Sequence, residues 1–141
     1  MPSRTAQVEV IVFKIVDDEV LFLVLKRNEQ KGGFWQSVTG GVHEGEGLNQ
    51  AAKRELWEET GIIQYVRLIE DVHYFEFETN QGGILKEYVF GVQVSPDTDI
   101  TLSSEHTEMR WCSLRESLTL LKYDSNKTAF QKLFVSLTAL G

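Results

Sequence analysis

Residues 40–62 read GGVHEGEGLNQAAKRELWEETGI. Glycines are dense in the first part of this segment, and glutamates crowd into its second part at Glu55, Glu58 and Glu59. Residues 48–60 are mostly good helix formers, and the glycine that follows them suits the C-terminal end of a helix. The segment therefore predicts a glycine-rich loop that leads into a helix carrying a dense set of acids.

The three glutamates of this helix lie on one face, because residues three and four positions apart are neighbours on a helix surface. We call this face (Glu55, Glu58 and Glu59) the carboxylate ridge. Like charges at this spacing repel, so the ridge destabilises the helix unless something offsets the repulsion. A hard divalent cation does so, since Mg²⁺ and Mn²⁺ prefer oxygen ligands. The alternative is a solvated acidic face that binds nothing.

The residues just before the ridge can organise it. Arg54 is able to hold a carboxylate with two parallel hydrogen bonds. Glu46 lies before the helix and could pair either with Arg54 or with the helix N-terminus. The glycine pair at 40–41 permits a close approach of the backbone, so a loop carbonyl could supply another oxygen ligand.

The spacing of the whole segment resembles the Nudix box, GX5EX7REUXEEXGU, in which U is a bulky aliphatic residue. All of its defined positions are occupied, and they are Gly40, Glu46, Arg54, Glu55, Leu56, Glu58, Glu59, Gly61 and Ile62. The flanks FWQSVTG, SEHTEMRW and YDSNKTAFQKL are similar to the branch that includes dihydroneopterin triphosphate pyrophosphatases and dATP-type pyrophosphohydrolases. The sequence is identified on these residues as a member of the Nudix hydrolase family.

The resemblance implies an α/β protein with the Nudix fold, an α/β/α sandwich with a mixed β-sheet, as a single domain over residues 1–141. It implies a pyrophosphohydrolase that depends on Mg²⁺ or Mn²⁺ and acts on a phosphoric anhydride bond. The expected substrate is a dNTP, an NTP or dihydroneopterin triphosphate, cleaved to the monophosphate and pyrophosphate. Two alternatives stay open: another diphosphate-linked substrate (an oxidised nucleotide, a dinucleoside polyphosphate or a nucleotide sugar), and a non-catalytic nucleotide-binding module.

Roles within the site follow from the same resemblance. The implied metal ligands are oxygens of Gly40, Glu55, Glu58, Glu59 and Glu105. Arg54 is expected to be one of the catalytic residues. Together with Glu46 it would hold the metal ligands in position from behind, without binding the metal itself. The base that activates water stays open among Glu55, Glu58 and Glu105, because family members do not all take it from the box. For Glu105, a loop carboxylate in solvent is the alternative.

Cations and rings outside the box are the candidates for substrate binding. Arg27 ends a predicted strand and could meet a phosphate, unless it is only a solvated strand end. Trp35 or Phe34 could stack on a base or pterin ring, and a core position is the alternative for either. Gln36 could contact a ring edge. His106 is balanced between contact with the substrate and a structural role in its loop.

The rest of the chain reads as strands and helices around this segment. Hydrophobic patterning predicts strands at 6–15, 19–27, 34–38 (ending at the glycine pair), 66–79, 85–94 and 106–114. The strand at 66–79 is either continuous or broken near Asp71. A capping box predicts a short helix that begins at Ser113, and residues 125–140 predict a closing amphipathic helix. This order of elements favours a mixed sheet covered by helices on its two faces.

Composition narrows the class of partner. A length of 141 residues suits one domain, and the net charge of −7 argues against binding of a long nucleic acid. A small phosphorylated substrate remains compatible, since a divalent cation reverses the local sign of an acidic site. No apolar run approaches the roughly 20 residues of a membrane helix. The single Cys112, expected to be buried, makes a reducing cytoplasm the default. The oligomeric state is open between monomer and homodimer.

Overall fold

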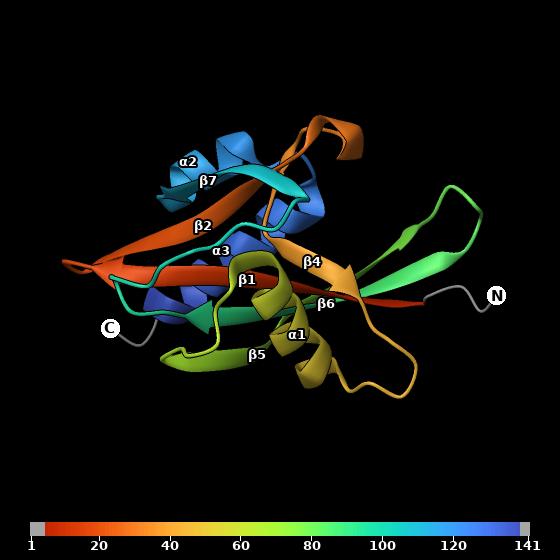
Figure 1. The fold of residues 1–141 in the computed structure, drawn as a ribbon, viewed down its shortest axis with the longest axis horizontal. Helices are drawn as coiled ribbons and strands as arrows, with labels where there is room; N and C mark the ends of the chain where they lie inside the picture. The colour runs from red at the N-terminus through yellow and green to blue at the C-terminus, as the bar shows by residue number, and fades with distance from the viewer. Residues whose placement is uncertain (1–4, 139–141) are drawn as a thin grey trace.

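The computed structural model describes residues 5–138, which form a mixed seven-stranded sheet between two layers of helix (Figure 1). In chain order the elements are β1 (Ala6–Val16), β2 (Glu19–Arg27), the 3-10 helix η1 (Glu29–Lys31), β3 (Trp35–Gln36), β4 (Val38–Gly41), α1 (Leu48–Thr60), β5 (Arg67–Glu78), β6 (Ile84–Gln93), β7 (His106–Cys112), α2 (Leu114–Leu120) and α3 (Asp124–Thr138). The predicted α/β/α sandwich with a mixed sheet is confirmed.

β1 is the strand around which the sheet is built. It pairs in parallel with β6 on one edge, and on its other edge it pairs first with β4 and then with β2, both antiparallel. β2 pairs with β1 only as far as Phe22, so its remaining residues up to Arg27 pair instead with β3 and β7. The sheet therefore divides beside β1, with β4 on one branch and β2, β3 and β7 on the other.

Side chains of β1 alternate between two hydrophobic clusters, because successive residues of a strand point to opposite faces. Val8 and Val10 pack in the cluster that contains Leu56 of α1. Ile11 packs in the cluster that contains Phe130 of α3. Figure 1 shows the result, with α1 in front of the sheet and α2 and α3 behind it.

α1 is placed by its ends and by its apolar side. Gly61 ends it with a positive φ of 75°, and the Gly61 N–H donates to the carbonyl of Trp57 at 2.8 Å. The predicted glycine stop is therefore confirmed. Ala52 and Leu56 are buried against the sheet. Packing of this side sets the rotation of the helix and leaves the neighbouring carboxylates beside β4.

Two predicted strands differ from the structure. The strand predicted at 34–38 does not end at the glycine pair, because Gly40 and Gly41 themselves pair with β1 as the end of β4. The segment 66–79 forms one strand, β5, but its pairing with β6 shifts around Asp71, which has a φ of 57°. The predicted last residues of the closing helix, 139–140, lie outside the described residues.

Two smaller predictions concern the ends of the sheet. The capping box is present, since Ser113 Oγ accepts from the N–H of Glu116 at 3.1 Å and the Glu116 side chain accepts from the N–H of Ser113 at 2.9 Å. Cys112 is buried, as predicted. None of the helices within residues 5–138 is long and apolar enough to cross a membrane.

Candidate active site

The carboxylate ridge lies along α1 with unequal burial. Glu55 and Glu59, one turn apart, have only 8% and 3% of their surface exposed. The side chain of Glu58 is 44% exposed, and its Oε1 accepts a hydrogen bond from Arg54 Nη1 at 3.0 Å. The ridge therefore presents two buried carboxyl groups and one at the surface.

β4 brings Gly40 directly against Glu55. A Cβ atom at position 40 would lie 1.9 Å from Glu55 Oε2, a distance that no pair of non-bonded atoms tolerates. Gly40 is paired in register with Val8 of β1, so the requirement for glycine comes from space and not from a positive φ. The main chain of β4 and the Glu55 carboxyl group therefore lie in contact.

Arg54 ties the loop before α1 to the ridge. Its Nε and Nη2 donate to the two oxygens of Glu46 at 2.8 and 3.0 Å, a bidentate pairing. Nη2 also donates to the Gly41 carbonyl at 2.8 Å, and Nη1 lies 3.4 Å from Glu55 Oε1. Of the two alternatives for Glu46, the structure has the pair with Arg54. This pair lowers the pKa of Glu46 to about 2 and raises the pKa of Arg54.

The two buried acids of the ridge hold protons more tightly than ordinary glutamates. Burial raises the pKa of Glu59 to about 9, with further contributions from Glu55 and Glu105 and an opposing one from Arg27. Burial also raises the pKa of Glu55 to about 7, against the effect of Arg54. Negative charge is therefore unfavourable here until a cation lies beside it.

The loop before β7 adds two side chains to the same place. Glu105 lies close enough for its charge to raise the pKa of both Glu55 and Glu59. His106 is buried, and its Nε2 lies 3.6 Å from Glu59 Oε1. Burial lowers the pKa of His106, so the imidazole is neutral near pH 7. The structure thus brings Glu105 to the ridge, and His106 packs against Glu59 from the buried side.

The donor atoms fit a hard divalent cation. Glu55 Oε2 and Glu59 Oε1 are buried and have no hydrogen-bond partner among the described residues. Unpartnered buried carboxylate oxygens are unfavourable, and oxygen is the ligand that Mg²⁺ and Mn²⁺ prefer. Within residues 5–138, no three His, Cys, Asp or Glu side chains already converge on one point. Glu58 accepts a hydrogen bond from Arg54, and it lies close enough to Glu55 to raise the pKa of that carboxyl group.

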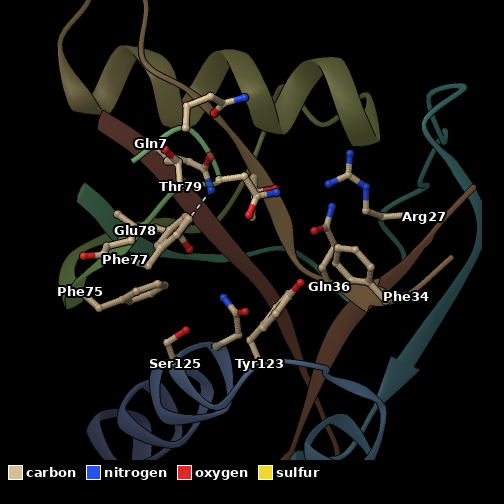
Figure 2. Close-up of a pocket in the computed structure, with 15 residues that line it drawn as sticks. Gln7, Arg27, Phe34, Gln36, Phe75, Phe77, Glu78, Thr79, Tyr123 and Ser125 are labelled. Atoms are coloured by element: carbon tan, nitrogen blue, oxygen red, sulfur yellow. Dashed lines mark hydrogen bonds between the residues drawn. The ribbon is translucent and has the colours of Figure 1, made fainter. Parts of the chain in front are cut away.

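A pocket of about 720 Å³ lies between α1 and α3, and the three glutamates of the ridge are not part of its lining (Figure 2). Its lining includes Gln7, Arg27, Phe34, Gln36, Thr39, Phe75, Phe77, Glu87, Tyr123 and Asn126. Figure 2 shows Arg27 near α1 and Phe75 on the far side. Arg27 connects the pocket to the ridge, because its charge acts on Glu59 and its buried Nε has no partner among the described residues. The volume is in the range of small-ligand sites.

A family model, the NUDIX domain, matches residues 5–133. The chain belongs to the Nudix family. The predicted family is confirmed, and with it the prediction of a hydrolase that acts on phosphoric anhydride bonds.

Relatives of this Nudix hydrolase agree with the branch predicted from its flanks. It is 30% identical to the dihydroneopterin triphosphate diphosphatase of Escherichia coli K12, over 92% of this chain and 93% of that protein. The solved E. coli dihydroneopterin triphosphate pyrophosphohydrolase superposes with a TM-score of 0.80 at 29% identity, covering 94% of this chain and 97% of that one. This chain is also 35% identical to an octanoyltransferase of Myxococcus xanthus, over 86% of its own length. The matched segment covers only 34% of that protein.

The segment before the Nudix box sends its side chains in two directions. Gln36 lines the pocket, and its Nε2 donates to Nε2 of His106 at 3.3 Å. Trp35, one residue earlier on β3, instead packs against the cluster that contains Phe130, with the guanidinium of Arg110 over its ring at 5.2 Å. Alternation along the strand is the reason. The structure therefore does not bring Trp35 to the pocket, and Phe34 is the one of the two predicted rings that lines it.

Several pocket residues of this Nudix domain were not predicted. They are Gln7, Thr39, Phe75, Phe77, Glu87, Tyr123 and Asn126. Each belongs to a strand, loop or helix start whose local pattern only indicates secondary structure. Acids inside apolar strand patterns, Glu9 in VEVIVF of β1 and Glu87 in LKEYVFGVQV of β6, were the kind of signal that this face of the sheet is not all core.

Proposed function

We propose that this Nudix hydrolase is a divalent-metal-dependent pyrophosphohydrolase of a nucleoside-triphosphate-type substrate, a nucleotide or a pterin triphosphate. The observation that carries the proposal is the pair of buried, unpartnered carboxylate oxygens on Glu55 and Glu59. Arg27 lies between these oxygens and a pocket large enough for a ring system. The name of the E. coli relative, a dihydroneopterin triphosphate diphosphatase, supports a triphosphate substrate.

The donor set supports a metal site at the ridge. The residues that would hold Mg²⁺ or Mn²⁺ are Gly40, Glu55, Glu58, Glu59 and Glu105. When bound there, the ion would polarise phosphoryl oxygens and offset the charge that develops on the departing pyrophosphate. Arg54 keeps Glu46 and the Gly41 carbonyl fixed against α1, so the ridge and β4 hold their relative positions.

The chemical step adds water across a P–O–P bond. The water oxygen forms a bond to one phosphorus, the bond from that phosphorus to the bridging oxygen breaks, and its electron pair leaves with pyrophosphate. A proton of the water passes to a carboxylate, for which Glu55, Glu58 and Glu105 are the candidates. Arg27 would hold the phosphate chain in line for this attack through hydrogen bonds from its guanidinium.

The remaining features of the proposal concern the protein's surroundings. We expect a small phosphorylated substrate and no long nucleic acid, because the net charge is −7. A single catalytic domain and a cytoplasmic location remain predictions, the latter from the lone buried Cys112. We expect either a monomer or a homodimer, and analytical ultracentrifugation would distinguish the two.

A pyrophosphate-release assay tests the proposal. The substrates are dNTPs, NTPs and dihydroneopterin triphosphate, each with Mg²⁺ and with Mg²⁺ plus excess EDTA. We expect turnover of at least one triphosphate that EDTA abolishes. Absence of turnover with every triphosphate would overturn the proposal.

A variant pair tests the metal assignment. Glu59→Gln keeps the size of the side chain but weakens it as a metal ligand, so kcat should fall by about 100-fold or more. Glu44→Gln, an exposed glutamate of the same segment, is the matched control and should keep full activity. Full activity of Glu59→Gln would show that the ridge does not hold the metal.

A further inference from the structure

A second pair of buried acids lies on the face of the sheet opposite the ridge. Glu9 of β1 is completely buried, and Glu87 of β6 is 2% exposed. Glu9 points to the same side as Ile11, toward α3, because residues two apart on a strand share a face. Glu87 joins it there, since it is paired in register with Gln7 across β1 and β6. The Nudix box contributes no side chain to this pair.

Neutral donors surround these two carboxyl groups. The hydroxyl of Ser37 donates to Glu9 Oε2, and Nδ2 of Asn126 donates to Glu9 Oε1 at 2.9 Å. Nε2 of Gln7 donates to Glu87 Oε1 at 2.5 Å. Among residues 5–138, no Lys, Arg or His forms an ion pair with either acid. A buried acid without a cation is unfavourable to ionise, so at most one negative charge is held here.

The pKa values of both acids are raised. Burial and the nearby charge of Glu87 raise the pKa of Glu9 well above its ordinary value. Burial also raises the pKa of Glu87, but hydrogen bonds from Glu9, Gln7 and Asn126 oppose that rise. Hydrogen bonds from Ser37 and Asn126 oppose the rise in the pKa of Glu9 as well. Both acids are therefore harder to ionise than an ordinary glutamate, and Glu87 is the one that accepts from Gln7.

Only the acceptor side of this network reaches the pocket. Gln7, Glu87 and Asn126 line the pocket, whereas Glu9 lies behind them. The amide nitrogens of Gln7 and Asn126 are directed to the carboxyl groups, and each amide keeps its carbonyl oxygen as an acceptor. This wall of the pocket therefore offers mainly acceptors, led by a carboxylate.

Aromatic rings form the rest of the pocket wall. Phe34 and Tyr123 contact one another edge to face, with their centroids 5.7 Å apart. Phe75 and Phe77, on the opposite side, have their centroids 6.2 Å apart (Figure 2). Such surfaces favour a flat aromatic ligand. A flat ring whose edge donates hydrogen bonds is the ligand that satisfies both the rings and the acceptors.

We propose that Glu87, supported by Glu9, Gln7 and Asn126, selects substrates whose ring carries two adjacent N–H donors. This is the 2-amino-4-oxopyrimidine edge shared by guanine and the pterins, which can meet a carboxylate through two parallel hydrogen bonds. Adenine and cytosine present a donor beside an acceptor, and uracil flanks one donor with acceptors, so each leaves an acceptor facing the carboxylate. The inference rests on the proposed function and specifies its substrate class.

The first test compares kcat/KM for GTP, ITP and ATP, because ITP differs from GTP only by the missing 2-amino group. We expect GTP to exceed ITP and ATP by about 10-fold or more, the effect of one lost hydrogen bond to a charged group. Equal values for the three nucleotides would overturn the inference. Dihydroneopterin triphosphate is the second arm: a value above that of GTP assigns the pterin, and a value below it but above that of ITP assigns guanine.

The second test uses a variant with the same shape. Glu87→Gln places a donor where the carboxylate had an acceptor, so the GTP/ITP ratio should fall toward 1, mainly through KM for GTP. Glu76→Gln, an exposed glutamate on neighbouring β5, is the control and should keep the wild-type ratio. An unchanged ratio in a folded Glu87→Gln protein would contradict the assignment. The wild-type comparison stays decisive if this variant does not fold.

A binding measurement separates the two proposals. Calorimetry with GMP and IMP reports recognition of the ring without any hydrolysis. Tighter binding of GMP supports the inference even if no triphosphate is cleaved, in which case only the proposed function fails. If triphosphates are hydrolysed but GMP and IMP bind equally well, the proposed function stands and the assignment of the ring is wrong.

Discussion

Two pairs of buried glutamates lie on opposite sides of one sheet, and their surroundings differ. Glu55 and Glu59 on α1 have oxygens without any donor among the described residues, and arginine side chains lie near them. Glu9 and Glu87 on β1 and β6 accept from a hydroxyl and from amide groups. The first pair can therefore accept a cation. The second pair is already hydrogen-bonded to protein groups, and only its Glu87 lines the pocket.

The difference shows how the same side chain is assigned to opposite tasks. A buried carboxylate whose oxygens lack donors is suited to a metal ion, since the ion provides the missing charge and ligand bonds. A buried carboxyl group that is hydrogen-bonded to neutral groups needs no ion. Where it borders a pocket, it can accept hydrogen bonds from the N–H groups of a neutral ring. We therefore place the phosphates of the substrate at the first pair as a proposal, and its ring at the second.

The largest expected effect comes from closing the space beside the first pair. Gly40→Ala puts a methyl group where Glu55 Oε2 lies, so the carboxylate must move and kcat/KM should fall by about 100-fold. Gly47→Ala is the control, because a Cβ there meets its nearest atom at an ordinary 3.5 Å. Steady-state kinetics of the two variants checks this expectation, and equal activity would mean that Glu55 tolerates displacement.

Next in size is the removal of the second pair's buried acid. Glu9→Ala leaves a cavity and deprives Ser37 and Asn126 of their acceptor, so the free energy of unfolding should fall by about 2–4 kcal/mol. Glu9→Gln keeps the volume and should be less destabilised. Urea unfolding of both variants is the measurement. A Glu9→Ala protein as stable as the wild type would show that the network does not stabilise the fold.

A smaller effect is expected from loosening the clamp on the first pair. Arg54→Lys keeps the charge but cannot make the bidentate pair with Glu46 or reach the Gly41 carbonyl at the same time. We expect kcat to fall by about 10-fold with little change in stability. Lys53→Ala, at the exposed neighbouring position, serves as control. An Arg54→Lys enzyme with wild-type kcat would remove Arg54 from the list of positioning residues.

The smallest expected effect is a dependence of the free energy of unfolding on pH, caused by Glu9 of the second pair. The pKa of Glu9 is raised in the folded state, so above the unfolded value of about 4.5 the folded protein binds more protons than the unfolded chain. Stability from this group is therefore fully present below pH 4.5 and declines as the pH rises. Between pH 5 and 6 the wild type should therefore lose stability relative to Glu9→Gln. Urea unfolding at these two pH values tests it, and a constant difference would contradict the raised pKa.

The chain itself determined the carboxylate ridge, the stop at Gly61 and the order of strands and helices. These features depend on residues that are close in sequence: acids three and four positions apart share a helix face whatever surrounds the helix. The alternation of β1 likewise follows from its own residues. Even here the exact ends were not determined, since the glycine pair expected to end a strand is part of β4.

Tertiary structure alone decided which residues meet the ridge and which form the pocket. Glu9 and Glu87 come together only because β1 and β6 pair in parallel in one particular register, and a shift of one residue would send Glu87 to the other face. Trp35 and Gln36 are adjacent in sequence, yet only Gln36 reaches the pocket, because the packing of β3 sets which side faces inward. The periodicity of a strand or helix determines which of its residues share a face. Which residues of other elements pack against that face is determined by the pairing and packing of the whole fold.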